Sequence, residues 1–340
     1  MKRCIQLAKN GLGTTYPNPM VGSVLVHNNA IIGEGWHYQA GQPHAEVNAV
    51  NSVRDTALFP EATIYVSLEP CSHFGKTPPC ADLIIEKGIK KVVIGTTDPN
   101  PKVAGQGVKK LMEAGCDVTI GILETECNEL NKRFFTVQQK KRPFIILKWS
   151  ETADGFIAPK TKTDQKPVWI TNEFSRQLVH KLRAEEQAIL IGTATANEDN
   201  PSLTTRDWFG NNPIRVILDR KNSLDKNLAI YNKQAATLIL TETPKESAEN
   251  LVYELLNFNE NTVSQICDIV YKMGIQSLIV EGGAKTLQAF IDANLWDEAL
   301  VFEGTSIFNE GVKAPIFSGR LVKQTNSNDD VLFHYKNPMV

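Results

Sequence analysis

The chain has 340 residues, of which 42% are hydrophobic and 22% charged, so it is long enough for two folded domains and is not a disordered protein. A formal net charge of −2, with no long basic run, argues against a nucleic-acid polymer as the main ligand but allows a small phosphorylated ligand. Six cysteines are too few for a disulfide scaffold, and no apolar stretch reaches transmembrane length, so we expect a cytoplasmic protein without a membrane or nucleic-acid partner.

The first half of the chain alternates predicted strands and helices. Runs rich in β-branched residues predict strands, and periodic or proline-started segments predict helices. We expect strands over residues 21–27, 31–35, 62–68, 90–96 and 117–121, and helices over 1–10, from 43 onward, 80–87, 105–114 and 124–138. This order predicts a three-layer α/β domain with helices on both faces of one sheet.

Three potential metal ligands lie in this half. His44 follows Pro43 at the start of a helix, strand 62–68 leads to Cys71, and Cys80 opens another helix. One imidazole and two thiolates are a normal zinc ligand set, and three protein ligands leave one position for water. Glu46 is placed to transfer the protons of that water, and H-x-E followed by P-C…C is typical of nucleobase deaminases. We therefore predict a catalytic zinc site with His44, Cys71 and Cys80 as ligands and Glu46 as the acid–base residue.

The spacing of the two cysteines departs from the generic deaminase pattern. Eight residues separate Cys71 from Cys80, where the generic pattern has two. The inserted segment is polar and cationic, and Lys76 in it could meet a phosphate as a point charge. The alternative is a purely structural zinc, which would need a fourth protein ligand, and His73 could supply it.

A second domain is expected from Pro143 onward, with the boundary near residue 140. Predicted strands cover residues 144–149, 188–192, 214–219, 237–241, 277–281 and, as the last strand region, 299–302; predicted helices cover 173–183, capped by Thr171 or Asn172, and 284–293. A strand followed by Gly282-Gly283 and a helix can cradle a phosphate, although an ordinary strand–helix turn is an equally good interpretation. No G-x-G-x-x-G occurs, so a Rossmann dinucleotide site is not supported.

Ordered motifs in the first 140 residues resemble those of the bifunctional deaminase–reductases of riboflavin biosynthesis. They are residues 15–22, 35–37, 41–46, 69–80 and 98–101. The resemblance implies a cytidine-deaminase-like domain acting on 2,5-diamino-6-ribosylamino-4(3H)-pyrimidinone 5′-phosphate. It also implies a substrate pocket lined by Asn18, His37, His73, Lys76, Asp98 and Asn100. Each of these could instead shape a loop, and Asp98 and Asn100 also suit a turn.

Motifs in the second half resemble the reductase half of the same family. They are residues 154–155, 169–171, 180–183, Gly192 with Thr195 and Asp199, and residues 201–206, 215–219 and 281–283. The resemblance implies a dihydrofolate-reductase-like α/β domain that uses NADPH to reduce the ribosyl group to ribityl, giving 5-amino-6-ribitylamino-uracil 5′-phosphate. It implies that NADP is bound by Ser150, Trp169, Thr195, Asp199 and Gly283, and the substrate by Pro167, Arg183, Leu203, Arg206 and Glu281. Arg183 and Arg206 suit phosphate binding, or alternatively surface salt bridges.

Some positions depart from the family pattern. Pro167 stands where a small hydroxyl residue is expected, the run 151–153 is unusual, and Gln187 replaces a common acidic residue. None of these changes removes a zinc ligand or Glu46.

We therefore predict a deaminase domain over residues 1–140 and a reductase domain over 141–340, with one zinc ion per chain and a homo-oligomeric assembly implied by the resemblance. Two rival hypotheses stay open. In the first, the second domain only binds a ligand. In the second, the zinc is structural or the substrate is RNA, and the near-neutral charge argues against RNA.

Overall fold

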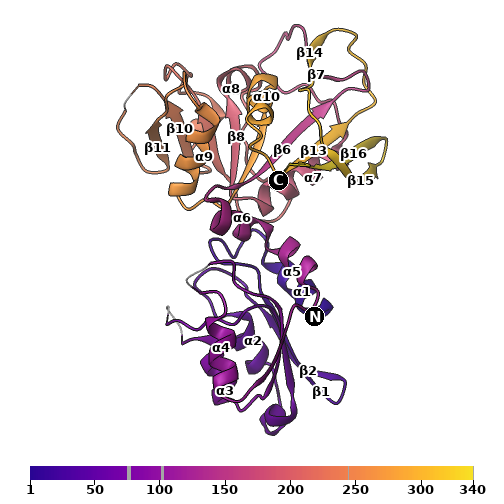
Figure 1. Ribbon diagram of the computed structural model, residues 1–340. Helices are drawn as coiled ribbons and strands as arrows, with labels where there is room; N and C mark the ends of the chain where they lie inside the picture. The colour runs from indigo at the N-terminus through magenta and orange to yellow at the C-terminus, as the bar shows by residue number, and fades with distance from the viewer. Residues whose placement is uncertain (75–77, 101–102, 244, 340) are drawn as a thin grey trace. The chain divides into compact units, whose positions relative to one another are not determined.

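The computed structural model describes residues 1–74, 78–100, 103–243 and 245–339, and these form two compact units, Met1–Lys141 and Arg142–Val340. Each unit is built around its own β-sheet (Figure 1). Within the described ranges, no helix is both long enough and apolar enough to cross a membrane.

The sheet of the first unit has five strands in the order β2-β1-β3-β4-β5. Their bounds are β1 (Gly22–His27), β2 (Ala30–Trp36), β3 (Thr63–Leu68), β4 (Lys91–Thr96) and β5 (Asp117–Ile120). The pairs β2–β1 and β1–β3 are antiparallel, and β3, β4 and β5 are parallel to one another. All five strands lie where the hydrophobic pattern predicted them.

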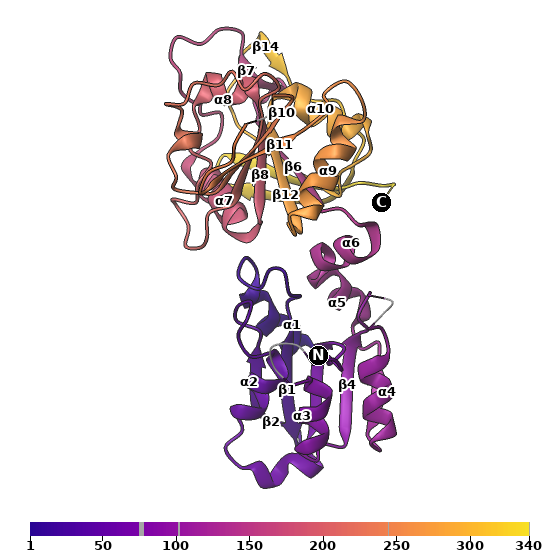
Figure 2. The ribbon, with the colours of Figure 1, turned by 90° about the vertical axis from the view of Figure 1, so that its left-hand side faces the viewer.

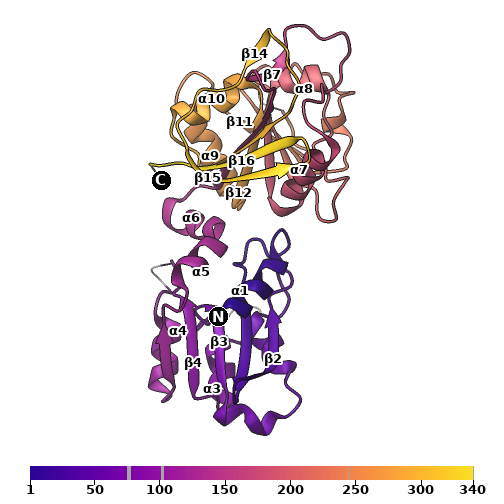
Figure 3. The ribbon, with the colours of Figure 1, turned by 90° about the vertical axis from the view of Figure 1, so that its right-hand side faces the viewer.

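Helices cover both faces of this sheet. The helices α2 (Ala45–Asn51), α3 (Cys80–Glu86) and α4 (Gln106–Glu113) lie next to one another on one face (Figure 2). On the other face, α1 (Lys2–Ala8) packs against β1, β2 and β3, and α5 (Glu124–Leu130) packs against α1 and β4 (Figure 3). Successive residues of β1 separate the two layers, since Leu25 joins the core under α2 and Val24 joins the core under α1. The predicted three-layer architecture is confirmed.

The helix expected over residues 124–138 is wrong as a single element. The chain forms α5 and then α6 (Lys132–Lys140), with a break at Asn131, whose φ of −104° and ψ of 22° are not helical. The buried Asn131 side chain donates to the carbonyl of Met20 and accepts from its N–H, both at 2.8 Å. A tertiary pair of hydrogen bonds therefore overrides the local helical pattern.

The second unit contains a nine-stranded sheet in the order β11-β10-β9-β8-β12-β6-β13-β16-β15. Its strands are β6 (Phe144–Glu151), β8 (Ala188–Gly192), β9 (Ile214–Leu218), β10 (Thr237–Thr241), β11 (Leu251–Leu255), β12 (Ser277–Gly282), β13 (Glu298–Glu303), β15 (Arg320–Ser327) and β16 (Asp330–Lys336). The seven strands from β11 to β13 in this order are parallel, and β16 and β15 add an antiparallel hairpin. A separate two-stranded sheet joins β7 (Phe156–Pro159) to β14 (Gly311–Lys313).

Four helices cover this larger sheet. One core cluster contains residues of α9 (Thr262–Lys272) and α10 (Ala284–Asp292), and the cluster on the opposite face contains residues of α7 (Glu173–Glu185) and α8 (Thr193–Asp199). Along β6, Ile145 and Leu147 belong to the first cluster, and Phe144 and Ile146 belong to the second. Because side chains alternate along a strand, Lys148 points to the α7–α8 face, within an otherwise apolar run.

The prediction for the second unit is confirmed in part. Asn172 is the N-cap of α7, and its side chain accepts the N–H of Ser175 at 2.9 Å, as one of the two capping options predicted. The expectation that the strand at 299–302 is the last one is wrong, because β14, β15 and β16 follow it. Nearly all of β15 is exposed at the sheet edge, so its sequence lacks the apolar pattern of a buried strand. The elements α8, α9, β7 and β11 were also not predicted.

Candidate active sites

His44, Cys71 and Cys80 come together in the first unit. His44 is the N-cap of α2, Cys71 follows β3, and Cys80 is the first residue of α3. Their ligand atoms lie within 4.8 Å of one another, with His44 Nδ1 3.6 Å from Cys71 Sγ and 3.3 Å from Cys80 Sγ. Among the described residues, His73 is not in this group, so the cluster has the three ligands of an open zinc site rather than four.

The separations and the chemistry of this cluster fit zinc. Bonds of about 2.3 Å to sulfur and about 2.0 Å to nitrogen place tetrahedral ligand atoms about 3.6 Å apart, close to what is found here. Hydrogen bonds from the Cys80 thiol and from His44 hold the pKa of Cys71 well below its usual range. The backbone N–H of Cys80 also donates to Cys71 Sγ at 3.3 Å. A sulfur that is stabilised as thiolate beside two further soft donors is ready to bind a divalent cation.

Glu46 lies in the first turn of α2, two residues after His44. Its side chain is almost fully buried, with 3% of the residue exposed. This burial, reinforced by the charge of Cys71, raises the pKa of the Glu46 carboxyl to about 7. A carboxyl group with such a pKa can both accept and donate a proton near neutrality.

Asn18 and His37, two of the predicted substrate residues, form a pair beside His44. The ring centroids of His37 and His44 are 5.4 Å apart. His37 Nδ1 lies 3.1 Å from the carbonyl of Pro43, which can only accept, so Nδ1 carries the proton and Nε2 accepts from the Asn18 amide at 3.1 Å. Burial lowers the pKa of His37, which keeps this imidazole neutral.

Glu69 anchors the segment that carries Asp98 and Asn100. The buried Glu69 carboxylate accepts the backbone N–H groups of Asp98 at 3.1 Å, Gly105 at 3.0 Å and Gly107 at 2.9 Å. Asp98 in turn accepts the N–H of Asn100 at 2.8 Å, as its predicted turn role requires. The sequence reasoning did not identify Glu69 as functional, and its position directly before Pro70-Cys71 is the available signal.

The two remaining predicted substrate residues belong to the segment between the cysteines. His73 is exposed, and a positive charge on it would oppose the burial that raises the pKa of Asp98. Lys76 lies outside the described residues.

The second unit contains a cavity of about 900 Å³ at the carboxyl ends of its parallel strands. Gly192 ends β8, Leu218 ends β9, Gly282 ends β12 and Ser150 is the second-last residue of β6, and all four line it. Open α/β sheets generally bind ligands at this edge, and the volume suits a ligand of cofactor size. All ten residues predicted for the reductase site line the cavity: Ser150, Pro167, Trp169, Arg183, Thr195, Asp199, Leu203, Arg206, Glu281 and Gly283.

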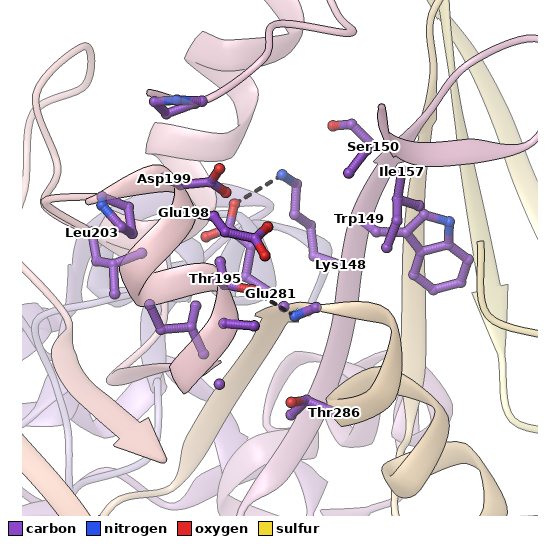
Figure 4. Close-up of a pocket in the computed structure, with 18 of the residues that line it drawn as sticks. Lys148, Trp149, Ser150, Ile157, Thr195, Glu198, Asp199, Leu203, Glu281 and Thr286 are labelled. Atoms are coloured by element: carbon purple, nitrogen blue, oxygen red, sulfur yellow. Dashed lines mark hydrogen bonds and ion pairs between the residues drawn. The ribbon is translucent and has the colours of Figure 1, made fainter. Parts of the chain in front are cut away.

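A cluster of three charged residues forms the buried side of the cavity. Figure 4 shows Lys148, from β6, pointing toward Glu281, and their Nζ and Oε1 atoms are 2.9 Å apart. Arg183 from α7 donates to the other carboxylate oxygen at 2.8 Å. Burial alone would raise the pKa of Glu281, but the charges of Arg183 and Lys148 outweigh it and lower this pKa to about 2. Among the described residues, Arg183 Nε is buried and has no hydrogen-bond partner.

Arg206 approaches the same cavity from the segment after α8. Its guanidinium contacts the hydroxyls of Ser202 and Thr204. Burial and the neighbouring charge of Arg183 lower the pKa of Arg206, as expected where two guanidinium groups lie close together. Leu203, which lies between Ser202 and Thr204, has a backbone φ of +55°, a value that residues other than glycine rarely adopt. Two nearby cations in a cavity form a natural anion site.

The glycine turn before α10 lies against α8. Gly283 donates its N–H to Thr195 Oγ1 at 2.9 Å. A Cβ at Gly283 would lie 3.2 Å from that same oxygen, which is closer than an ordinary van der Waals contact, so a side chain at residue 283 would crowd Thr195. Asp199 forms an ion pair with Lys162. The half-exposed ring of Trp169 stacks on Arg176, with Cζ of the guanidinium 4.5 Å from the ring centroid. These residues fit a phosphate-bearing dinucleotide such as NADPH.

The chain matches two family models and relatives of similar length. Residues 1–96 match the cytidine and deoxycytidylate deaminase zinc-binding region, and residues 143–336 match the RibD C-terminal domain. Riboflavin biosynthesis protein RibD of Aquifex aeolicus is 39% identical, with 99% of this chain and 97% of the relative covered. The protein of the same name from Synechocystis is 38% identical, with 94% and 87% covered.

Two solved structures cover nearly the whole chain. A diaminohydroxyphosphoribosylaminopyrimidine deaminase/5-amino-6-(5-phosphoribosylamino)uracil reductase from Thermotoga maritima has a TM-score of 0.89 and 41% identity, covering 99% of this chain and 97% of that one. RibD from Acinetobacter baumannii has a TM-score of 0.88 and 32% identity, covering 98% and 97%.

Proposed function

This chain belongs to the riboflavin biosynthesis protein RibD family, and we propose that its two units carry out two successive reactions on one small phosphorylated pyrimidine. It is a bifunctional enzyme of riboflavin biosynthesis, with a zinc-binding deaminase domain and an NADPH-dependent reductase domain. We assign deamination of diaminohydroxyphosphoribosylaminopyrimidine to residues 1–140. We assign reduction of the product, 5-amino-6-(5-phosphoribosylamino)uracil, to residues 141–340.

The proposed deaminase centre consists of three zinc ligands and one acid–base residue. His44, Cys71 and Cys80 would hold zinc, which supplies Lewis-acid activation of water when bound. The buried Glu46 carboxyl is then placed to take a proton from water. It would give this proton to the ring nitrogen as the water oxygen adds to the ring carbon, and it would then move the second proton of that oxygen to the departing ammonia.

Recognition of the pyrimidine and its phosphate is assigned to residues around this centre. The Asn18 amide, oriented by the neutral His37, and the carboxylate and amide of Asp98 and Asn100 can match the donors and acceptors of a diaminopyrimidinone edge. Glu69 supports this arrangement, because it holds the backbone from which Asp98 projects. His73 and Lys76 would supply cationic groups for the phosphate.

In the second unit, we assign NADPH binding to Ser150, Trp169, Thr195, Asp199 and Gly283. Support comes from the Gly282-Gly283 turn at the N-terminus of α10, whose partial positive charge favours a phosphate group. NADPH supplies the two-electron reduction when bound.

The substrate of the reductase is assigned to Pro167, Arg183, Leu203, Arg206 and Glu281. Arg183 and Arg206 suit the phosphate, and Glu281 orients both Arg183 and Lys148. Conversion of a ribosyl group to ribityl adds a hydride equivalent to carbon and a proton to the ring oxygen that is released. We assign Lys148, which the sequence reasoning missed, as the donor of that proton.

The observation that carries this proposal is the convergence of all ten predicted reductase residues on one cavity beside Lys148. A stepwise assay tests it. Purified protein receives the diaminopyrimidine substrate, and ammonia release is recorded; NADPH is then added, and its absorbance is followed. Release of ammonia followed by NADPH oxidation is expected. Ammonia without oxidation would instead support the rival in which the second unit only binds a ligand.

A further inference from the structure

His180 is a buried imidazole in the cavity of the second unit that has no role in the assignments above. It lies on α7, three residues before Arg183, so both side chains are on the helix face that lines the cavity. Only 4% of the residue is exposed. A buried histidine in a ligand cavity needs a partner for each ring nitrogen, and these partners define what it does.

The ring of His180 faces Arg206 and its neighbour Asp207. Its Nδ1 accepts the backbone N–H of Arg206 at 3.1 Å, so the ring proton lies on Nε2, which is 3.4 Å from Asp207 Oδ2. Burial, followed by the charges of Arg183 and Arg206, lowers the pKa of His180 to about 4, against the weaker opposing charges of Asp207 and Glu281. The imidazole is therefore neutral at neutral pH and Nδ1 stays an acceptor.

The segment that carries Arg206 is held at several backbone positions. The fully buried Arg215 donates from Nε to the carbonyl of Ser202 at 2.9 Å, and Arg183 donates to the carbonyl of Thr204 at 3.3 Å. Between these two positions, Leu203 has a φ of +55°, a conformation that costs about 1–2 kcal/mol. A strained segment keeps its shape only when its surroundings hold it.

His180 supplies the hydrogen bond at the far end of this segment. The next residue toward the N-terminus, Thr205, donates its N–H to Asn212 Oδ1 at 2.9 Å, but that contact is exposed. The bond from His180 is therefore the more protected restraint on the backbone from which the Arg206 guanidinium projects.

We infer that His180 is a positioning residue for phosphate recognition, because it fixes the backbone of Arg206 so that Arg206 and Arg183 together bind the phosphate of the reductase substrate. The inference rests on the proposed function, which supplies a phosphorylated substrate for this cavity. His180 itself need not touch the substrate. Its effect should appear in the affinity for the phosphate group and not in the chemical step.

Three variants test whether His180 acts through the hydrogen bond that its Nδ1 accepts or only through the packing of its ring. Asparagine can place its amide oxygen near the position of Nδ1, glutamine places it nearer to Nε2, and phenylalanine fills the ring volume without an acceptor. His180→Asn, His180→Gln and His180→Phe are therefore compared with wild type in steady-state reduction. Each is assayed with 5-amino-6-(5-phosphoribosylamino)uracil and with the same compound lacking the phosphate. Ammonia release by the first unit checks that each chain is intact.

The expected pattern is specific to the phosphate. His180→Phe and His180→Gln should raise KM for the phosphorylated substrate about tenfold, the size expected for one hydrogen bond that orders a charged contact, with kcat within about twofold. His180→Asn should restore KM to within about twofold to threefold of wild type. KM for the compound without phosphate, and for NADPH, should be the same in all four proteins.

Other patterns overturn the inference. An equal rise in KM for both compounds, or a fall in kcat with both, would assign His180 to packing or chemistry. An equal KM for the phosphorylated substrate in His180→Asn and His180→Gln would exclude a role for the hydrogen bond at Nδ1. This comparison tests the inference even if His180→Phe does not fold. Absence of NADPH oxidation in wild type would contradict the proposed function itself. Normal NADPH oxidation in wild type, with an unchanged KM in all three His180 variants, would contradict only the inference about His180.

Discussion

Glu281 and Lys148 lie side by side on adjacent parallel strands of the second unit. The register of β12 on β6 pairs Val280 with Leu147, so the next residue of each strand projects from the same face, and the two form an ion pair of 2.9 Å. Arg183 occupies the second carboxylate oxygen at 2.8 Å. One acidic side chain thus holds two cations at the wall of the cavity, and mutation can test separately the charge of Lys148 and its proposed role as proton donor.

Substitution of Lys148 should affect only the reductase. Lys148→Met removes the charge and the proton, whereas Lys148→Arg keeps a positive charge beside Glu281 but introduces a group that does not deprotonate in proteins. We expect both variants to lower kcat for NADPH oxidation by at least about 100-fold, the range of general acid catalysis, with ammonia release unchanged. Substantial activity in Lys148→Arg would show that the charge is needed and the proton is not.

Loss of the carboxylate should destabilise the second unit. Glu281→Gln leaves Lys148 and Arg183 buried without a counter-charge, which costs about 3 kcal/mol. The pKa of Glu281 is lowered from 4.5 to about 2, so its charged form stabilises the fold fully above about pH 4.5, and this contribution is lost as the pH falls toward 2. Urea unfolding should show a constant difference from wild type between pH 6 and 8 and a smaller one below pH 4.5. A difference that persisted at low pH would argue against an ionic origin.

Variants of the first unit should separate metal binding from proton transfer. Glu46→Gln keeps the three ligands, so we expect about one zinc per chain, a loss of deaminase kcat of at least about 100-fold, and unchanged reduction of supplied intermediate. Cys80→Ser removes a ligand and should lower both the zinc content and deamination. Zinc is measured by atomic emission on the purified proteins. Loss of both enzyme activities in folded Glu46→Gln would contradict two independent sites.

Local patterns in the sequence predicted most of the fold and the metal cluster. The buried strands of both units and the Asn172 cap follow from local apolar runs and a local capping pattern, and the group of His44, Cys71 and Cys80 follows from the ordered H-x-E and P-C…C motifs. A metal site needs particular ligand residues in a particular order, so it can be recognised in the sequence.

Residues whose role depends on distant partners were not predicted. Lys148 lies in an apolar strand and acquires its role only through the β12–β6 register, which places Glu281 beside it. Asn131 breaks a helix because Met20, 111 residues away, accepts and donates to it. The edge strand β15 lacks a buried face, so no periodicity marks it.

Substitution of Glu69 should test how the segment that carries Asp98 and Asn100 is held. The buried carboxylate accepts four backbone N–H groups, from Asp98, Gly105, Gly107 and Val108, two of them in the first turn of α4. Glu69→Gln replaces one acceptor oxygen by a donor and removes the charge that favours the helix N-terminus. We expect a loss of about 2–3 kcal/mol in the stability of this unit and a raised KM for deamination, with zinc content unchanged. Loss of zinc as well would mean that Glu69 supports the metal ligands instead of this segment.

The pH dependence of stability should report the neutral state of His180. Its pKa falls from 6.5 in the unfolded chain to about 4 in the folded one, because burial and then Arg183 and Arg206 disfavour the charged ring, while Asp207 and Glu281 oppose this. The unfolded chain therefore binds the proton first, and stability declines as the pH falls from about 6.5 toward 4.

Asparagine at position 180 does not titrate, so His180→Asn lacks this decline. After allowance for solvent screening, we expect its stability relative to wild type to improve by roughly 2 kcal/mol between pH 7 and pH 4.5. Four of the five tryptophans belong to the second unit, so urea unfolding followed by tryptophan fluorescence reports mainly on that unit. Parallel stability curves for the two proteins across this range would mean that His180 is protonated in the folded state, and Nδ1 could then not accept the N–H of Arg206.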